Sequence, residues 1–87
     1  MPETLEERVI RVIAKAQHIP REAVSTDSKF EDLNIDSLDG LQILFALEEE
    51  FNINIPDDAG QRIRSVRQAV DGVAALVEGT GESVNMQ

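Results

Sequence analysis

The chain reads NIDSLDGLQILFALEEEFNINIP over residues 34–56, and this stretch decides the fold. Its apolar residues recur every three or four positions, which is the spacing of one face of an α-helix. Asp36 is a natural N-cap, because its carboxylate can accept a backbone N–H. We therefore expect a helix over residues 37–51 and a turn before the proline that ends the stretch. The expected inward-facing residues are Ile43, Leu44, Leu47 and Phe51.

Helical spacing of apolar residues also precedes this stretch. It predicts a first helix over residues 3–17, which Pro20 ends. Residues 18–35 then form a long connection rich in turn and capping residues. A connection of this length in a small domain usually has a function. The apolar residues expected to pin it to the core are Ala23, Val24, Phe30, Leu33 and Ile35.

Two more helices are predicted after the turn. Asp57 opens a short one that ends near Ile63. The pattern Ser65-x-x-Gln68 is a capping-box signature for a longer one. The fold class is therefore all-α: a four-helix bundle of three main helices and a short third helix, with the long connection between the first two.

Two glycines, Gly79 and Gly81, are expected to end the last helix. We therefore predict one helical domain over residues 1–78 and a disordered C-terminal tail over residues 79–87. Eighty-seven residues suffice for a single small domain, which we expect to be a monomer.

Charge is concentrated in one part of the chain. The formal net charge is -9, and residues 30–61 contain nine acidic residues and no Lys or Arg. A field of one sign indicates partners of the opposite sign. The acidity and the near absence of aromatic residues argue against nucleic-acid binding.

The remaining composition excludes further classes. There is no cysteine, and therefore neither a disulfide framework nor a thiolate nucleophile. No apolar run approaches the roughly 20 residues that cross a bilayer, so membrane insertion is not expected. No signal peptide is visible, which favours the cytoplasm.

Ser37 stands between two carboxylates at the predicted start of the helix over residues 37–51. A serine there is most often only part of a helix cap. Serine hydrolysis fits poorly, because the chain has no Gly-x-Ser-x-Gly motif and its one histidine, His18, lies in the first connection. Asp36 and Asp39 lack the spacing and the glycine of a calcium loop. We therefore expect neither an enzyme nor a metal site.

The combination of blocks around Ser37 changes this interpretation. Asn34-Ile35-Asp36-Ser37-Leu38-Asp39, then Leu47-Glu48-Glu49-Glu50-Phe51 and Ile53-x-Ile55-Pro56, closely resembles the acyl carrier protein family. The spacing between the blocks matches as well. The resemblance extends from about Leu5 to Leu76, and it implies the family's acyl-carrier-like fold.

The resemblance implies a carrier and not a catalyst. In this family, 4′-phosphopantetheine is attached covalently to the serine that matches Ser37, by a phosphopantetheinyl transferase that uses coenzyme A. The thiol of that arm holds acyl groups as thioesters. Fatty-acid, lipid or polyketide-type biosynthetic enzymes then receive them, among them acyl-transferring, condensing and lipid-modifying enzymes with basic docking patches.

Two further sets of residues follow from the resemblance and the helical pattern. The acidic second helix is the expected recognition face for partner enzymes. Its candidate partner-binding residues are Asp36, Leu38, Asp39, Leu41, Phe45, Glu48 and Glu49. Family members shelter the acyl chain between the second and later helices. The matching acyl-pocket positions are Leu47, Phe51, Ile55, Ile63, Ala69 and Val70, for which core packing is an equally good explanation.

Several residues depart from the pattern of core fatty-acid carriers. They are Gly40, Gln42, Gly60, Arg62, Arg64 and Arg67. These differences favour a specialised carrier, although neutral drift explains them equally well, and the acyl cargo stays open. A second hypothesis, from another class, is an acidic helical module that binds a basic protein without any cofactor.

Overall fold

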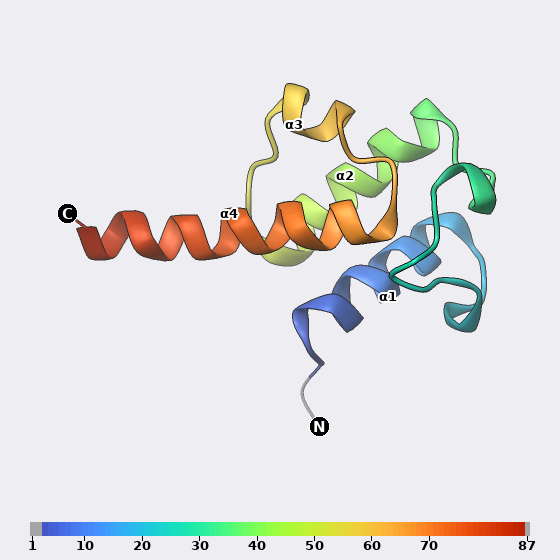
Figure 1. Cartoon of the computed structure of the whole chain (residues 1–87), viewed down its shortest axis with the longest axis horizontal. Coiled ribbons are helices and arrows are strands. Elements are labelled where there is room, and N and C mark those ends of the chain that lie inside the picture. The colour runs from blue at the N-terminus through green and yellow to red at the C-terminus, as the bar shows by residue number, and fades with distance from the viewer. Residues whose placement is uncertain (1–2, 87) are drawn as a thin grey trace.

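Four α-helices make up the computed structural model, which describes residues 3–86, with side chains described for residues 3–78. Helices α1, α2 and α4 pack on one another, and the short α3 lies at the edge of this bundle beside α2 (Figure 1). No strand occurs among the described residues, so the predicted all-α class is confirmed. The bounds are α1 Leu5–Gln17, α2 Ser37–Phe51, α3 Asp57–Gln61 and α4 Val66–Met86, with two 3-10 turns, η1 Arg21–Ala23 and η2 Glu31–Leu33.

Helix α1 begins two residues later than predicted, because Thr4 caps it. The Thr4 hydroxyl accepts the backbone N–H of Glu7 at 3.1 Å, and the Glu7 carboxylate accepts that of Thr4 at 2.9 Å. The Thr4 N–H lowers the pKa of the Glu7 carboxyl. At the other end His18 takes a left-handed conformation with φ 57°, and so the helix ends before Pro20.

Helix α2 has the predicted bounds. The Asp36 carboxylate accepts the backbone N–H of Asp39 at 2.8 Å, which is the expected N-cap. Asn52 ends the helix in a left-handed conformation with φ 55°. Ile43 and Leu47 are fully buried, while Phe51 is only half-buried.

Helix α3 ends at Gln61, two residues before the predicted end. The N–H groups of Arg62 and Ile63 bond three residues back, to the carbonyls of Ala59 and Gly60, both at 3.1 Å. This tighter turn replaces the α-helical pattern and leads the chain into α4.

Helix α4 starts after the predicted cap. The Ser65 hydroxyl accepts the N–H of Gln68 at 3.2 Å, and the Gln68 carboxamide accepts the N–H of Arg64 at 2.7 Å. In a capping box the Gln68 side chain would accept the N–H of Ser65 itself. Here it accepts the N–H of the preceding residue, Arg64.

The predicted end of the last helix at Gly79 and Gly81 is wrong. Helix α4 continues through both glycines to Met86. A glycine ends a helix when it adopts positive φ, and a proline ends it by lacking an N–H; no proline follows here, and no positive-φ glycine is found among the described residues. The disordered tail over residues 79–87 stays a prediction, because those side chains lie outside the described part.

The core is built from α1, α2, α4 and the long connection. Val24, Phe30 and Ile35 of the connection are buried and Leu33 is half-buried, but Ala23 is exposed, so its predicted pinning role is wrong. Ala23 lies on the solvent side of η1, a turn that has no buried residue. The buried residues are Val9, Val12, Ile13, Ala14, Val24, Phe30, Ile35, Ile43, Leu47, Ile55, Val66, Ala69 and Val73.

A short backbone bridge fastens the long connection to the segment before α4. Lys29 and Ser65 form an isolated antiparallel bridge. The N–H of Phe30 donates to the carbonyl of Arg64 at 2.9 Å, and that of Val66 donates to the carbonyl of Ser28 at 3.0 Å. The two bonds lie on either side of Lys29 and fix the backbone at the buried Phe30, a few residues before the start of α2.

Candidate functional site

Ser37 is the first residue of α2 and is exposed. The first helical bond runs from the Gly40 N–H to the Asp36 carbonyl at 2.8 Å, and the Asp36 carboxylate occupies the N–H of Asp39. The N–H groups of Ser37 and Leu38 therefore have no acceptor among the described residues. These two N–H groups and the helix dipole favour a negatively charged group next to the Ser37 hydroxyl, even with Asp36 as the cap.

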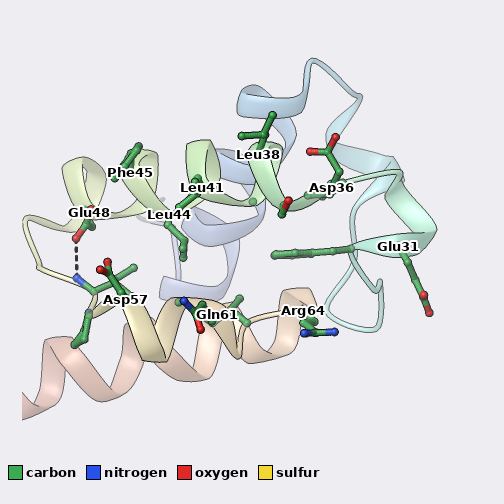
Figure 2. Close-up of a pocket in the computed structure, with 18 of the residues that line it drawn as sticks. Glu31, Asp36, Leu38, Leu41, Leu44, Phe45, Glu48, Asp57, Gln61 and Arg64 are labelled. Atoms are coloured by element: carbon green, nitrogen blue, oxygen red, sulfur yellow. Dashed lines mark hydrogen bonds between the residues drawn. The ribbon is translucent and has the colours of Figure 1, made fainter.

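Ser37 lines a groove of about 1160 Å³ that lies between α2 and α3, and Figure 2 shows the neighbouring Asp36 at one end of it. Leu44 and Glu48 line it from α2, and Asp57 and Gln61 line it from α3. Buried Phe30, Ile35 and Ile55 lie at its base. A flexible arm attached at its mouth would find an apolar channel beside it.

Three large apolar side chains of α2 are exposed. Leu38 is 69%, Phe45 59% and Leu41 48% exposed, and all three also line the groove. Figure 2 shows Leu38 and Phe45 on the side of α2 away from α3, with Asp36 beside Leu38. Exposed apolar groups rimmed by acids are typical of an interaction surface. The predicted partner-binding residues Asp36, Leu38, Leu41 and Phe45 therefore share one accessible end and face of α2.

The three consecutive acids of α2 differ in their surroundings. Glu48 is half-buried, and its carboxylate accepts the backbone N–H of Ile55 at 2.7 Å. Glu50 accepts from Arg8 and Arg11, each at 2.9 Å. Glu49 is exposed and has no ion pair or hydrogen bond within the described part of the chain.

The pair of arginines at Glu50 links α1 to α2. Hydrogen bonds from Arg8, and then from Arg11, lower the pKa of the Glu50 carboxyl. The Arg11 guanidinium also bonds Glu3 at 2.9 Å, and mainly that contact raises the pKa of Arg11. Arg8 further lies over the Phe51 ring, 4.4 Å from its centroid. The network is part of the scaffold that holds α2.

The six predicted acyl-pocket residues divide into two groups. Ile55 and Ile63 line the groove. Leu47 and Ala69 are fully buried in the core, and Phe51 and Val70 are half-buried against it. Among the other residues that line the groove, the sequence argument did not assign Phe30, Ile35, Leu44 and Gly60 to the acyl pocket. The apolar pattern of residues 30–35 was the available signal for the first two.

Two cations lie at the mouth of the groove. Lys29 and Arg64 are exposed and line it, because the Lys29–Ser65 bridge brings these distant parts of the chain together. Arg62 is also exposed, and Arg67 lies 3.7 Å from Asp27 in a highly exposed pair. The surface near Ser37 is thus acidic on α2 and basic on the α3–α4 connection.

Other chemistry near Ser37 finds no support in the geometry. His18 lines a second hollow between α1 and α2, away from the groove that holds Ser37. No group of three or more acidic or histidine side chains that could hold a metal ion occurs within the described residues. Nor does any described helix have the length and hydropathy to cross a membrane.

Comparison with known families agrees with this geometry. Residues 7–73, well over half of the chain, match the family described as "Phosphopantetheine attachment site". The chain belongs to this family and is a carrier protein of the acyl-carrier type. It bears 4′-phosphopantetheine as a covalent cofactor, and it carries groups for enzymes without itself being one. Such domains interact with a phosphopantetheinyl transferase and with biosynthetic enzymes.

Proposed function

We propose that this protein carries acyl groups as thioesters on a 4′-phosphopantetheine arm attached to Ser37. It presents them to fatty-acid, lipid or polyketide-type biosynthetic enzymes. The observation that carries the proposal is the position of the exposed Ser37, which lines a groove with an apolar base and begins a helix whose first two N–H groups have no acceptor among the described residues.

The residues around Ser37 fit this cofactor. When bound, the arm supplies the thiol that holds the acyl cargo. The free N–H groups of Ser37 and Leu38 can donate to a phosphodiester, and the helix dipole favours its negative charge. The long connection leaves the hydroxyl open to a modifying enzyme, while Phe30 and Ile35 offer apolar contact to the arm or its cargo.

The proposed partner surface is the exposed side of α2. Leu38, Leu41 and Phe45 would form the apolar centre of a small interface. Asp36, Asp39 and Glu49 would steer a basic docking patch toward it, since opposite charges raise association rates more than they raise affinity. Individually weak exposed charge pairs, of about 0–1 kcal/mol, suit a carrier that must release each enzyme quickly. Glu48 contributes charge while it also holds the backbone at Ile55.

The pathway we favour is a specialised one. Its partners would be acyl-transferring, condensing or lipid-modifying enzymes that a cytoplasmic, monomeric carrier can visit in turn. Gly40 and Gln42 on α2, the exposed Arg62, and Arg64, which lines the groove, alter the surface that such enzymes meet.

A mass measurement tests the proposal. The protein is incubated with coenzyme A, magnesium and a broad-specificity phosphopantetheinyl transferase. We expect the mass of one phosphopantetheine to be gained by the wild type and by Ser25→Ala, a control at another exposed serine. We expect no gain for Ser37→Ala. An unmodified wild type, or a gain that persists in Ser37→Ala, would overturn the assignment of Ser37.

A further inference from the structure

Gly60 is the one buried residue of α3. A Cβ atom at this position would lie 2.7 Å from Cδ1 of Leu44 and 3.9 Å from Cγ2 of Ile55. The first separation is shorter than carbon atoms tolerate. A methyl group of Leu44 therefore occupies the space that a side chain at Gly60 would fill, and the two helices approach closely there.

Leu44 belongs to both the groove and the core. It lines the same groove as Ser37, and it is half-buried against the core cluster. Figure 2 shows it pointing from α2 toward α3. The core cluster against which Leu44 packs includes the fully buried Ile43 and Leu47. Leu44 thus stands between the open groove and the packed core.

We infer that Leu44, seated on Gly60, limits the depth of the groove and thereby the length of acyl chain that the protein shelters. This inference rests on the proposed acyl-carrier function. It assigns chain-length selection to the contact between Leu44 and Gly60, which neither helical periodicity nor the family match indicates.

The chemistry of the two side chains gives the size of the effect. Leucine carries three more side-chain carbons than alanine, and a core that loses them relaxes only in part. Leu44→Ala should therefore lengthen the sheltered part of a chain by about two or three methylene groups, each of which gains from leaving water. Gly60→Ala in the Leu44→Ala background places a methyl in the emptied space and should shorten it again.

The test loads the modified protein with saturated acyl groups from butyryl to palmitoyl and measures the Tm of each form. In the wild type we expect Tm to rise with chain length up to a limit and then to stay constant. In Leu44→Ala the limit should move to chains about two carbons longer. In Leu44→Ala/Gly60→Ala it should return toward the wild-type value.

Gly72→Ala is the matched control, because a Cβ at Gly72 would make only an ordinary contact, 3.5 Å to Cδ1 of Ile63, and Gly72 does not line the groove. Its limit should equal that of the wild type. The same limit in Leu44→Ala as in the wild type, or a wild-type Tm that does not depend on chain length, would overturn the inference. Failure of the proposed function is distinguishable, since then no form gains the phosphopantetheine mass at all.

A second measurement needs no cargo. Thermal unfolding of the unmodified protein gives the change in Tm on Gly60→Ala with Leu44 present and with Leu44→Ala. We expect a more favourable change in the second background, because the clash is gone. Gly72→Ala, on α4 and outside the groove, should give the same change in both. Equal changes for Gly60→Ala in the two backgrounds would show that Leu44 does not occupy the space at Gly60, and would overturn the inference.

Discussion

The side of α2 that faces α1 and the side that faces solvent carry similar residues in different surroundings. Toward α1, Glu50 is held by two arginines, and Leu47 is fully buried. Toward solvent, Glu49 has no described partner and Leu41 is 48% exposed. Residues of one type on the same helix therefore differ in role: some hold the fold together, and others are free to contact other molecules. The residues that surround each side chain in the folded structure decide which role it has.

The largest expected effect on stability comes from replacing one leucine on each side of α2 by alanine. Leu47→Ala should lower the free energy of unfolding by about 2–5 kcal/mol, because it leaves a cavity in the core. Leu41→Ala should change it by less than about 0.5 kcal/mol, as exposed positions usually do. Urea denaturation measures both. Similar losses for the two variants would break the comparison.

Next in size is the hydrogen bond between Glu48 and the backbone of Ile55. Glu48→Ala should cost about 1 kcal/mol and leave the Ile55 N–H without its acceptor. Glu48→Gln keeps an oxygen in place and should retain most of the stability. Amide hydrogen exchange at Ile55 reports the bond directly. If its protection is unchanged in Glu48→Ala, Glu48 belongs with the solvent-facing acids instead.

A smaller effect, and one that depends on pH, is expected at Glu50. Its pKa is lowered in the folded state, mainly by Arg8 and then by Arg11. The stabilisation is therefore present above the ordinary glutamate pKa and is lost as the pH falls through the lowered value. Glu50→Gln should reduce Tm by a few degrees at neutral pH and by nothing in acid. In an Arg8→Ala/Arg11→Ala background, Glu50→Gln should show no such dependence; the same pH profile in both backgrounds would contradict the assignment.

The smallest effect should appear only in kinetics. Glu49→Gln is expected to leave Tm unchanged and to slow modification by a phosphopantetheinyl transferase about twofold at low salt, with a shallower salt dependence. Glu22→Gln removes the same charge from the exposed η1 turn and serves as the control. Equal slowing by both variants would mean that net charge matters and that the position of Glu49 does not.

Local sequence signals predicted much of the fold. The Asp36 cap and the apolar spacing gave the bounds of α2, and the Ser65 and Gln68 pattern gave the start of α4. These features depend on neighbours within one helical turn, and that is why a pattern could identify them. The sequence also indicated that Leu38 and Phe45, which are exposed, form a second apolar stripe on this helix, beside the one that packs in the core.

Features that depend on contacts across the fold were not predictable in the same way. The pattern marks Glu48 and Glu50 as two more acids of a solvated run, yet one binds the Ile55 backbone and the other binds Arg8 and Arg11. From the sequence alone, Gly60 only lowers the helix propensity of its segment. The structure shows that Leu44 occupies the space that a side chain at Gly60 would fill. Each of these roles is decided by a residue on another element, at a distance along the chain that periodicity does not encode.

The length of α4 has a practical consequence for work with this carrier. Its C-terminal part projects beyond the other helices, and in Figure 1 its end lies on the opposite side of the molecule from the start of α2. A dye, an affinity tag or a sensor surface attached to the projecting part of α4 would therefore leave the approach to Ser37 clear. The protein could be anchored there while enzymes are passed over it one after another.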